Sequence, residues 1–168
     1  MQQAYSLLGI QVNPLTIPQL NALIANAVQL GDRRIIANHN LHSIYLYHHD
    51  AKMRSFFAKA HYTHIDGMAL VLVGRLLGYP LKRDHRVTYV DWTAPLMAEA
   101  AQQGWRIFYL GGKPGVAEKG AKILQQRFPG LEIVTADGYF DARPESPENL
   151  AILDRINAYK PHILMVGM

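Results

Sequence analysis

Residues 105–136, WRIFYLGGKPGVAEKGAKILQQRFPGLEIVTA, decide the fold class of this sequence. A short, mostly apolar run typical of a buried strand is followed at once by the glycine-rich turn GGKPG (111–115). LEIVTA (131–136) is strand-like again. Between the turn and this second strand, the apolar residues fit a helical period: Val116, Ile123, Leu124 and Phe128. Strand, turn, helix and strand in this order predict a parallel βαβ unit.

The same alternation of strand and helix runs along the rest of the chain. Helix signals are clear in TIPQLNALIANAVQLG (16–31), where Thr16 is a candidate cap and Gly31 a stop, and Ser146 and Pro147 open the last helix. Further strands are expected in SLLGIQV (6–12), RRIIANHN (33–40), YTHI (62–65) and HILMVGM (162–168), and further helices over 41–60, over 67–77 and from Thr93 onward. We therefore predict an α/β protein with a Rossmann-like, mostly parallel sheet and helices on both faces.

Composition sets limits on the class of protein. The chain has 168 residues, of which 49% are hydrophobic and 18% charged, so we expect one globular domain over residues 1–168. The formal net charge of +4 favours anionic ligands or surfaces but is too small to indicate nucleic acid as a partner. Without cysteine there is no disulfide framework and no thiolate nucleophile.

The same composition bears on the cellular compartment. MQQAYSLLGIQV (1–12) lacks the features of a signal peptide, so we expect a cytosolic protein. The most apolar stretch, 68–77, is about half as long as the roughly 20 residues that span a bilayer, so it predicts a buried helix. Any contact with a membrane should then be peripheral.

Polar and glycine residues follow the predicted strands at their carboxyl ends. In parallel sheets, ligands bind beyond these ends. The segments that come there are 38–40 (NHN), 66–67 (DG), 111–115 (GGKPG) and 137–140 (DGYF). The GGKPG turn allows backbone N–H groups and the positive end of a helix to approach a phosphate, although it matches neither a Walker loop nor a dinucleotide fingerprint. A tight turn into a helix opened by Pro114 is the alternative interpretation.

Asp66 has two interpretations as well. Asp before a helix is a good N-cap, and a carboxylate at a strand end can also act as a general base. In HYTHID (61–66), H-x-x-H-x-D could offer metal ligands, but residues three apart on a strand face opposite sides, which argues against a metal site. The basic loop LKRDHR (81–86) is either solvated surface or a means of neutralising a diphosphate.

Six segments occur in an order that resembles one family of enzymes: IIANHN, HIDGMALV, RVTYVDW, FYLGGKPGVAEKGAKILQQRFPGLEIV, DGYF and PHILMVGM. Residues 5–168 resemble glycosyltransferase family 26, the bacterial transferases of teichoic acid, enterobacterial common antigen and exopolysaccharide synthesis. The sequence departs from the family at Tyr89, where glycine is common, and at His39-Asn40. Relatives continue past VGM with a polar segment and a basic amphipathic tail, so we expect that a chain ending at Met168 lacks part of the site.

The resemblance implies an inverting, metal-independent transfer from a UDP-sugar to a sugar linked through diphosphate to a polyprenol. It implies no cofactor, because the UDP-sugar is a substrate. It also implies a protein at the inner face of the cell membrane, held there by the C-terminal tail, and a homo-oligomer is possible. Asp66 then fits the base, with Asp91 as the second candidate. The residues expected to bind the donor are Asn38, Arg86, Asp91, Gly111, Gly112, Lys113 and Tyr139.

Two other classes of protein remain open from the sequence. A Rossmann-like oxidoreductase needs a dinucleotide fingerprint and an acidic contact to a ribose, which GGKPG does not supply. A non-catalytic domain that binds a sugar nucleotide is the second alternative. The resemblance also leaves open whether glucose, N-acetylmannosamine or its uronic acid is transferred.

Overall fold

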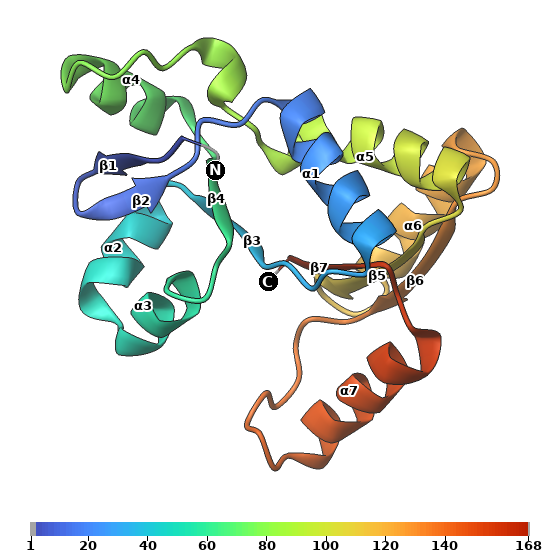
Figure 1. Cartoon of the computed structure of the whole chain (residues 1–168). Coiled ribbons are helices and arrows are strands. Elements are labelled where there is room, and N and C mark those ends of the chain that lie inside the picture. Colours follow the sequence, from blue (N-terminus) through green and yellow to red (C-terminus); the bar gives the residue numbers. More distant parts are fainter. Residues whose placement is uncertain (1–2, 168) are drawn as a thin grey trace. The chain divides into compact units, whose positions relative to one another are not determined.

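The computed structural model describes residues 3–167 and confirms the α/β class, with helices alternating with parallel strands along most of the chain (Figure 1). The chain divides into two compact units. The N-terminal unit extends to Thr93, and the C-terminal unit begins at Ala94. Each unit contains its own parallel sheet.

The N-terminal unit opens with a β-hairpin. Strands β1 (Tyr5–Leu7) and β2 (Ile10–Val12) pair antiparallel, and Leu8 and Gly9 between them have φ values of 51° and 80°. The single strand expected over residues 6–12 is therefore wrong, because two consecutive residues with positive φ form the tight turn of a two-residue hairpin. Helix α1 (Ile17–Leu30) follows, with Thr16 as N-cap and a left-handed Gly31 as C-cap, as predicted.

Strands β3 (Ile36–His39) and β4 (Tyr62–Ile65) form the parallel sheet of this unit. The segment between them is helical as predicted, but it consists of two helices, α2 (Leu41–His49) and α3 (Ala51–Phe57). Asp50 separates them: its backbone is extended, and its side chain accepts a hydrogen bond from the Lys52 N–H at 2.7 Å. An aspartate in this conformation starts a new helix instead of continuing the old one.

Helix α4 (Met68–Leu76) follows β4, and the short 3-10 helix η1 (Arg83–His85) leads to α5 (Tyr89–Gln103). The expected start of α5 at Thr93 is wrong by four residues. Thr93 lies inside the helix, where its hydroxyl donates to the Tyr89 carbonyl at 2.5 Å. Thr88 precedes the first turn and bonds to Asp91, an arrangement that starts the helix earlier.

The C-terminal unit confirms the predicted βαβ arrangement. Its sheet has the order β6 (Glu132–Ala136), β5 (Arg106–Gly111) and β7 (Ile163–Gly167), all parallel. Met168, the last residue of the strand expected over 162–168, lies outside the described residues. Helix α6 (Val116–Arg127) connects β5 to β6, and α7 (Pro147–Tyr159) connects β6 to β7. Ser146 is the N-cap of α7 and Pro147 its first residue, as predicted.

The buried face of α6 differs from the predicted one. Val116 and Ile123 are 58% and 64% exposed, whereas Ala117 and Ala121 are buried. The face toward the protein is therefore made of small side chains, and a search for large apolar residues at helical spacing misses it.

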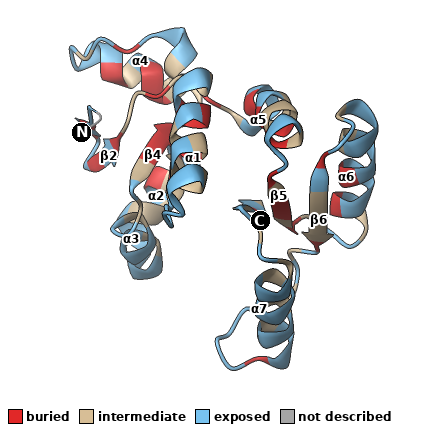
Figure 2. Cartoon of the chain, turned by 45° about the vertical axis from the view of Figure 1, so that its right-hand side comes forward, coloured by how far each residue is buried: buried red, intermediate tan, exposed pale blue. Residues whose placement is uncertain are grey.

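Each unit has a core of its own (Figure 2). In the N-terminal unit, the hairpin, β4 and α4 contribute a cluster that includes Leu7, Val12, Ile65 and Leu70, each 0% exposed. In the C-terminal unit, Phe108 on β5 is the largest fully buried residue of a cluster that α7 and β6 help to cover. Among the described residues, no helix is both long and apolar enough to cross a membrane.

Candidate functional site

Asp66 and Asn38 meet at the carboxyl end of the N-terminal sheet. The register pairs His39 with Ile65, so β3 and β4 end side by side, and the Asp66 N–H donates to the His39 carbonyl at 2.8 Å. The Asn38 side-chain amide, Nδ2, donates to Asp66 Oδ2 at 3.3 Å. A partly buried carboxylate is thus held beyond the strand end by a neutral amide.

Asp66 does not cap α4. The N-cap of this helix is Gly67, which has a φ of 124° and makes no side-chain capping hydrogen bond. Within residues 3–167, the hydrogen bond from Asn38 is the one contact the Asp66 side chain makes with another polar group. The capping interpretation of Asp66 is therefore wrong, and the carboxylate is left with lone pairs that no donor of the described chain occupies.

Arg86 and Asp91 form a second pair next to this strand end. Residue 86 bridges Ile65 in parallel, and the Val87 N–H donates to the Ile65 carbonyl at 2.8 Å. Arg86 Nη2 lies 2.5 Å from Asp91 Oδ2, and the Thr88 hydroxyl donates to the same oxygen at 2.9 Å. The ion pair is partly exposed, with 30% of the Arg86 side chain and 43% of the Asp91 side chain accessible. Asp91 thus already serves as the anchor of a cation.

His64 lies beneath these polar residues. It is the register partner of Asn38, so the two side chains share a face of the sheet. His64 is 3% exposed, its ring meets the Trp92 ring edge-on at 6.0 Å, and its Nδ1 has no hydrogen-bond partner in the described chain. Burial lowers the pKa of His64 to about 4, so the ring is neutral at pH 7. No group of three His, Asp or Glu side chains in residues 3–167 is arranged to hold a metal ion.

In the C-terminal unit, the predicted glycines lie where the end of β7 and the loops after β5 and β6 come together. The Gly112 N–H donates to the Gly167 carbonyl at 3.3 Å, and the Gly138 N–H donates to the Gly112 carbonyl at 2.9 Å. A Cβ at Gly111 would lie 2.2 Å from the Gly167 carbonyl oxygen, so only glycine fits there. Gly112 has a φ of 74°, a left-handed conformation that glycine adopts without strain.

The N-terminus of α6 completes this loop. Gly115 is its N-cap and supplies no side-chain cap, so the first turn keeps N–H groups that no capping side chain satisfies. The exposed Lys113 makes no ion pair in the described chain. Tyr139, after β6, is 73% exposed. The loop offers a cation and a helix N-terminus to an anionic ligand.

Asp137 is a residue of this loop to which the sequence assigned no role. It follows β6, and its Oδ1 accepts a hydrogen bond from the Gly115 N–H at 3.2 Å. The order along the chain is a glycine-rich turn, a helix, a strand and an acidic residue. Dinucleotide-binding units have the same order, and their acidic residue bonds to a ribose hydroxyl. The signal was present in the sequence as an acidic residue at a strand end, about 20 residues beyond the glycines.

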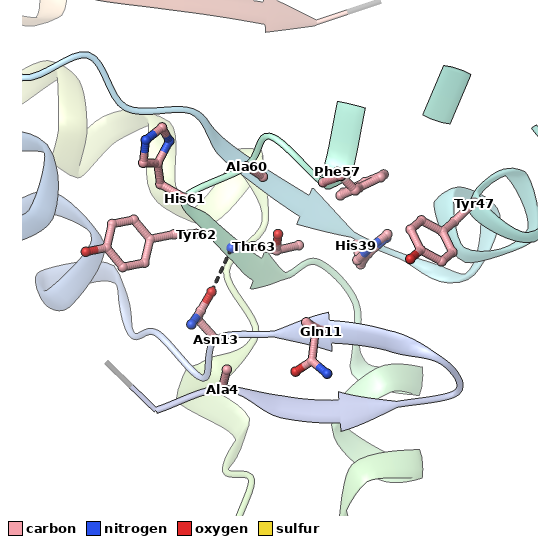
Figure 3. Close-up of a pocket in the computed structure, with 11 residues that line it drawn as sticks. Ala4, Gln11, Asn13, His39, Tyr47, Phe57, Ala60, His61, Tyr62 and Thr63 are labelled. Atoms are coloured by element: carbon pink, nitrogen blue, oxygen red, sulfur yellow. Dashed lines mark hydrogen bonds between the residues drawn. The ribbon is translucent and has the colours of Figure 1, made fainter. Parts of the chain in front are cut away.

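A pocket of about 340 Å³ lies in the N-terminal unit, and none of the predicted site residues lines it (Figure 3). One of its lining residues is His39, whose ring stacks on Phe57 with centroids 3.8 Å apart and whose Nδ1 is 3.0 Å from Ser43 Oγ. Burial, and to a smaller extent His48, lower the pKa of His39 to about 4. Among the described residues, the lining contains aromatic, amide and hydroxyl groups and no Asp, Glu, Lys or Arg side chain, which suits an uncharged ligand. The lining residues are Ala4, Gln11, Asn13, His39, Tyr47, Phe57, Ala58, Ala60, His61, Tyr62 and Thr63.

Polar and glycine residues at the carboxyl ends of parallel strands define an α/β protein of the class that binds ligands at that edge of its sheet. The chain belongs to the glycosyl transferase WecG/TagA/CpsF family, whose model matches residues 5–168. This match confirms the resemblance found in the sequence and identifies the activity as transfer of a sugar. It gives no support to the oxidoreductase alternative.

Proposed function

We propose that this protein is an inverting glycosyltransferase that uses a UDP-sugar as donor and a polyprenyl-diphosphate-linked sugar as acceptor. The product would be an intermediate of a bacterial cell-surface polysaccharide such as an exopolysaccharide. Family membership supports the reaction class, and the position of Asp66 carries the mechanism. No cofactor or metal ion is needed in this proposal.

Asp66 acts as the general base. In the reaction, the oxygen of an acceptor hydroxyl attacks the anomeric carbon of the donor, on the face opposite the leaving group. The new C–O bond forms as the bond between the anomeric carbon and the phosphate oxygen breaks, and the bonding electron pair leaves with UDP. The hydroxyl proton passes to a carboxylate oxygen of Asp66. Asn38, which donates to Oδ2, orients the carboxylate for this transfer.

Asp91 is the weaker candidate for the base. Its Oδ2 already accepts hydrogen bonds from a guanidinium and a hydroxyl, those of Arg86 and Thr88. A substrate hydroxyl would find that oxygen already occupied by two donors, whereas the Asp66 carboxylate accepts one hydrogen bond, from a neutral amide. Asp91 instead fixes the Arg86 side chain, and Arg86 would contact the anionic part of the donor.

The GGKPG loop binds the nucleotide. Lys113 and the uncapped N-terminus of α6 would contact the diphosphate, since both attract negative charge. Asp137 would accept a hydrogen bond from a ribose hydroxyl, as the acidic residue at the corresponding strand end does in dinucleotide-binding units. The exposed Tyr139 ring would lie along the uracil base.

Titration calorimetry with UDP tests this assignment, because two possible roles of Asp137 predict opposite changes in UDP affinity. Asp137→Asn should weaken UDP binding about tenfold if the carboxylate accepts a ribose hydroxyl, because a charge-assisted hydrogen bond is lost. If Asp137 only places a negative charge beside the diphosphate, the same substitution should tighten binding. Lys113→Ala should weaken binding in either case, and Lys122→Ala on the exposed side of α6, where Lys122 pairs with Glu118, is the matched control. Unchanged UDP affinity in Lys113→Ala and Asp137→Asn would remove the loop from the donor site.

A further inference from the structure

Helix α4 is apolar on nearly every side, although only one side of it is buried. Its nine residues, MALVLVGRL, contain one charged side chain, that of Arg75. Leu70 and Val71 are completely buried in the core of the N-terminal unit. A helix that is apolar all round is normally enclosed by protein or lipid.

The outer side of α4 ends in three leucines that nothing in the described chain covers. Leu72 is 51% exposed and Leu76 is 88% exposed, and Leu77, directly after the helix, is 55% exposed. Figure 2 shows buried and exposed residues together on this helix. The spacing of four and five residues from Leu72 places the three side chains on neighbouring turns of one face. Contiguous exposed leucines of this kind mark a docking surface.

The charged residues in the segment that contains these leucines are all basic. Between Asp66 and Asp84 the sequence has no acidic residue, and it has three basic ones: Arg75, Lys82 and Arg83. None of the three forms an ion pair within the described residues. Arg75 Nε donates to the Leu81 carbonyl at 2.7 Å, which ties the helix to the segment that bears the other two cations.

We propose that these leucines and cations, which we call the α4 surface, dock on an anionic lipid bilayer. Leucines on one face enter the region between headgroups and acyl chains, and basic side chains beside them pair with lipid phosphates. Arg75, whose Nε is bonded to the Leu81 carbonyl, keeps the terminal nitrogens of its guanidinium for the headgroups. An anionic lipid surface fits better than a protein partner, because it is complementary both to the exposed leucines and to cations that have no carboxylate between them.

This docking goes beyond the transfer reaction and uses different residues. A polyprenyl-linked acceptor would lie in a bilayer, so the α4 surface would bring the protein to its substrate. The experiment below measures lipid binding alone. A failure of lipid docking is therefore distinguishable from a failure of the proposed sugar transfer.

Flotation with vesicles tests the proposal directly. The protein should float with vesicles of phosphatidylcholine mixed with phosphatidylglycerol, far less with phosphatidylcholine alone, and less as salt is raised. Leu76→Ser combined with Leu77→Ser should lower partitioning at least about tenfold. Lys82→Gln combined with Arg83→Gln should lower it roughly 30-fold on anionic vesicles.

A control variant distinguishes binding through the α4 surface from nonspecific hydrophobic binding to vesicles. Leu150 and Leu153 on α7 are 49% and 45% exposed, so replacing both with Ser removes roughly two thirds of the exposed leucine surface that the Leu76 and Leu77 substitutions remove, at another place in the chain. This control should float like the unmodified protein, and all variants should keep its melting temperature. The proposal is overturned if the unmodified protein does not float, or if the α4 variants float as well as it does. It is also overturned if Leu76→Ser with Leu77→Ser dissolves a self-association seen by sedimentation and leaves flotation unchanged.

Discussion

Replacing Asp66 with Asn is the decisive change for the proposed mechanism, because the structure predicts its effect on stability separately. Asn keeps the shape of the side chain, and its carbonyl oxygen can still accept the hydrogen bond from Asn38, which is 3.3 Å long in the native protein. Only the charge-assisted part of that bond is lost, about 1 kcal/mol at most. Since Asp66 caps no helix, no capping energy is lost with it.

The expected effect on the rate is much larger. General bases contribute about 10²–10⁴-fold, which corresponds to roughly 3–5 kcal/mol of barrier. We predict that Asp66→Asn lowers transfer by at least about 100-fold. We also predict a melting temperature within about 3 °C of the unmodified protein and unchanged affinity for UDP.

The assay is a single-turnover measurement of UDP release with a lipid-linked sugar acceptor, in a form of the protein that shows transfer. Asp91→Asn is the matched control, because it removes a carboxylate of the same size from the same unit. This control should perturb Arg86 and weaken donor binding, while transfer at saturating donor falls much less. Near-normal turnover by Asp66→Asn would refute the assignment. A 100-fold loss in Asp91→Asn alone would transfer the role of base to that residue.

Other outcomes follow from the burial and packing of particular residues. The pKa values of His39 and His64 are lowered to about 4, below about 6.5 in the unfolded chain, so their contribution to stability should be complete above about pH 6.5 and be lost as the pH falls toward 4. Denaturant titrations at neutral pH and near pH 4.5 should show this loss, and His64→Gln should reduce it. Gly111→Ala, whose Cβ would meet the Gly167 carbonyl, should destabilise the protein by more than Gly112→Ala, for which about 1–2 kcal/mol is expected from the left-handed backbone. EDTA should leave UDP affinity unchanged in calorimetry, and a strict requirement for magnesium would contradict the proposed metal-independent reaction.

Helix ends were predictable where the signal is local. Thr16 and Gly31 mark the two ends of α1, and Ser146 and Pro147 mark the start of α7. Each works through its own backbone conformation or through contacts within one turn, so neighbouring residues suffice to reveal it. The break at Asp50 has the same local cause, but the apolar pattern on both sides concealed it.

The failures concern features that depend on distant residues. Leu8 adopts a positive φ in the hairpin, although nothing about leucine favours that conformation, because the pairing of β1 with β2 holds it there. The buried face of α6 consists of Ala117 and Ala121, which are small enough for the helix to pack closely. Tertiary packing decides both cases, and a search for periodicity cannot detect it.

The candidate site shows the same division between local and distant information. The sequence predicts which residues follow each strand, but it does not show how the surroundings of the Asp66 and Asp91 carboxylates differ. The register of β3 and β4 places Asp66 against a neutral amide, and the start of α5 at Tyr89 places Asp91 against a guanidinium. Asp91 Oδ2 already accepts from a guanidinium and a hydroxyl, whereas the Asp66 carboxylate accepts one hydrogen bond and keeps acceptor positions open for a substrate hydroxyl. The pairing of β3 with β4 and the first turn of α5 therefore distinguish Asp66, the proposed base, from Asp91, which holds Arg86 in place.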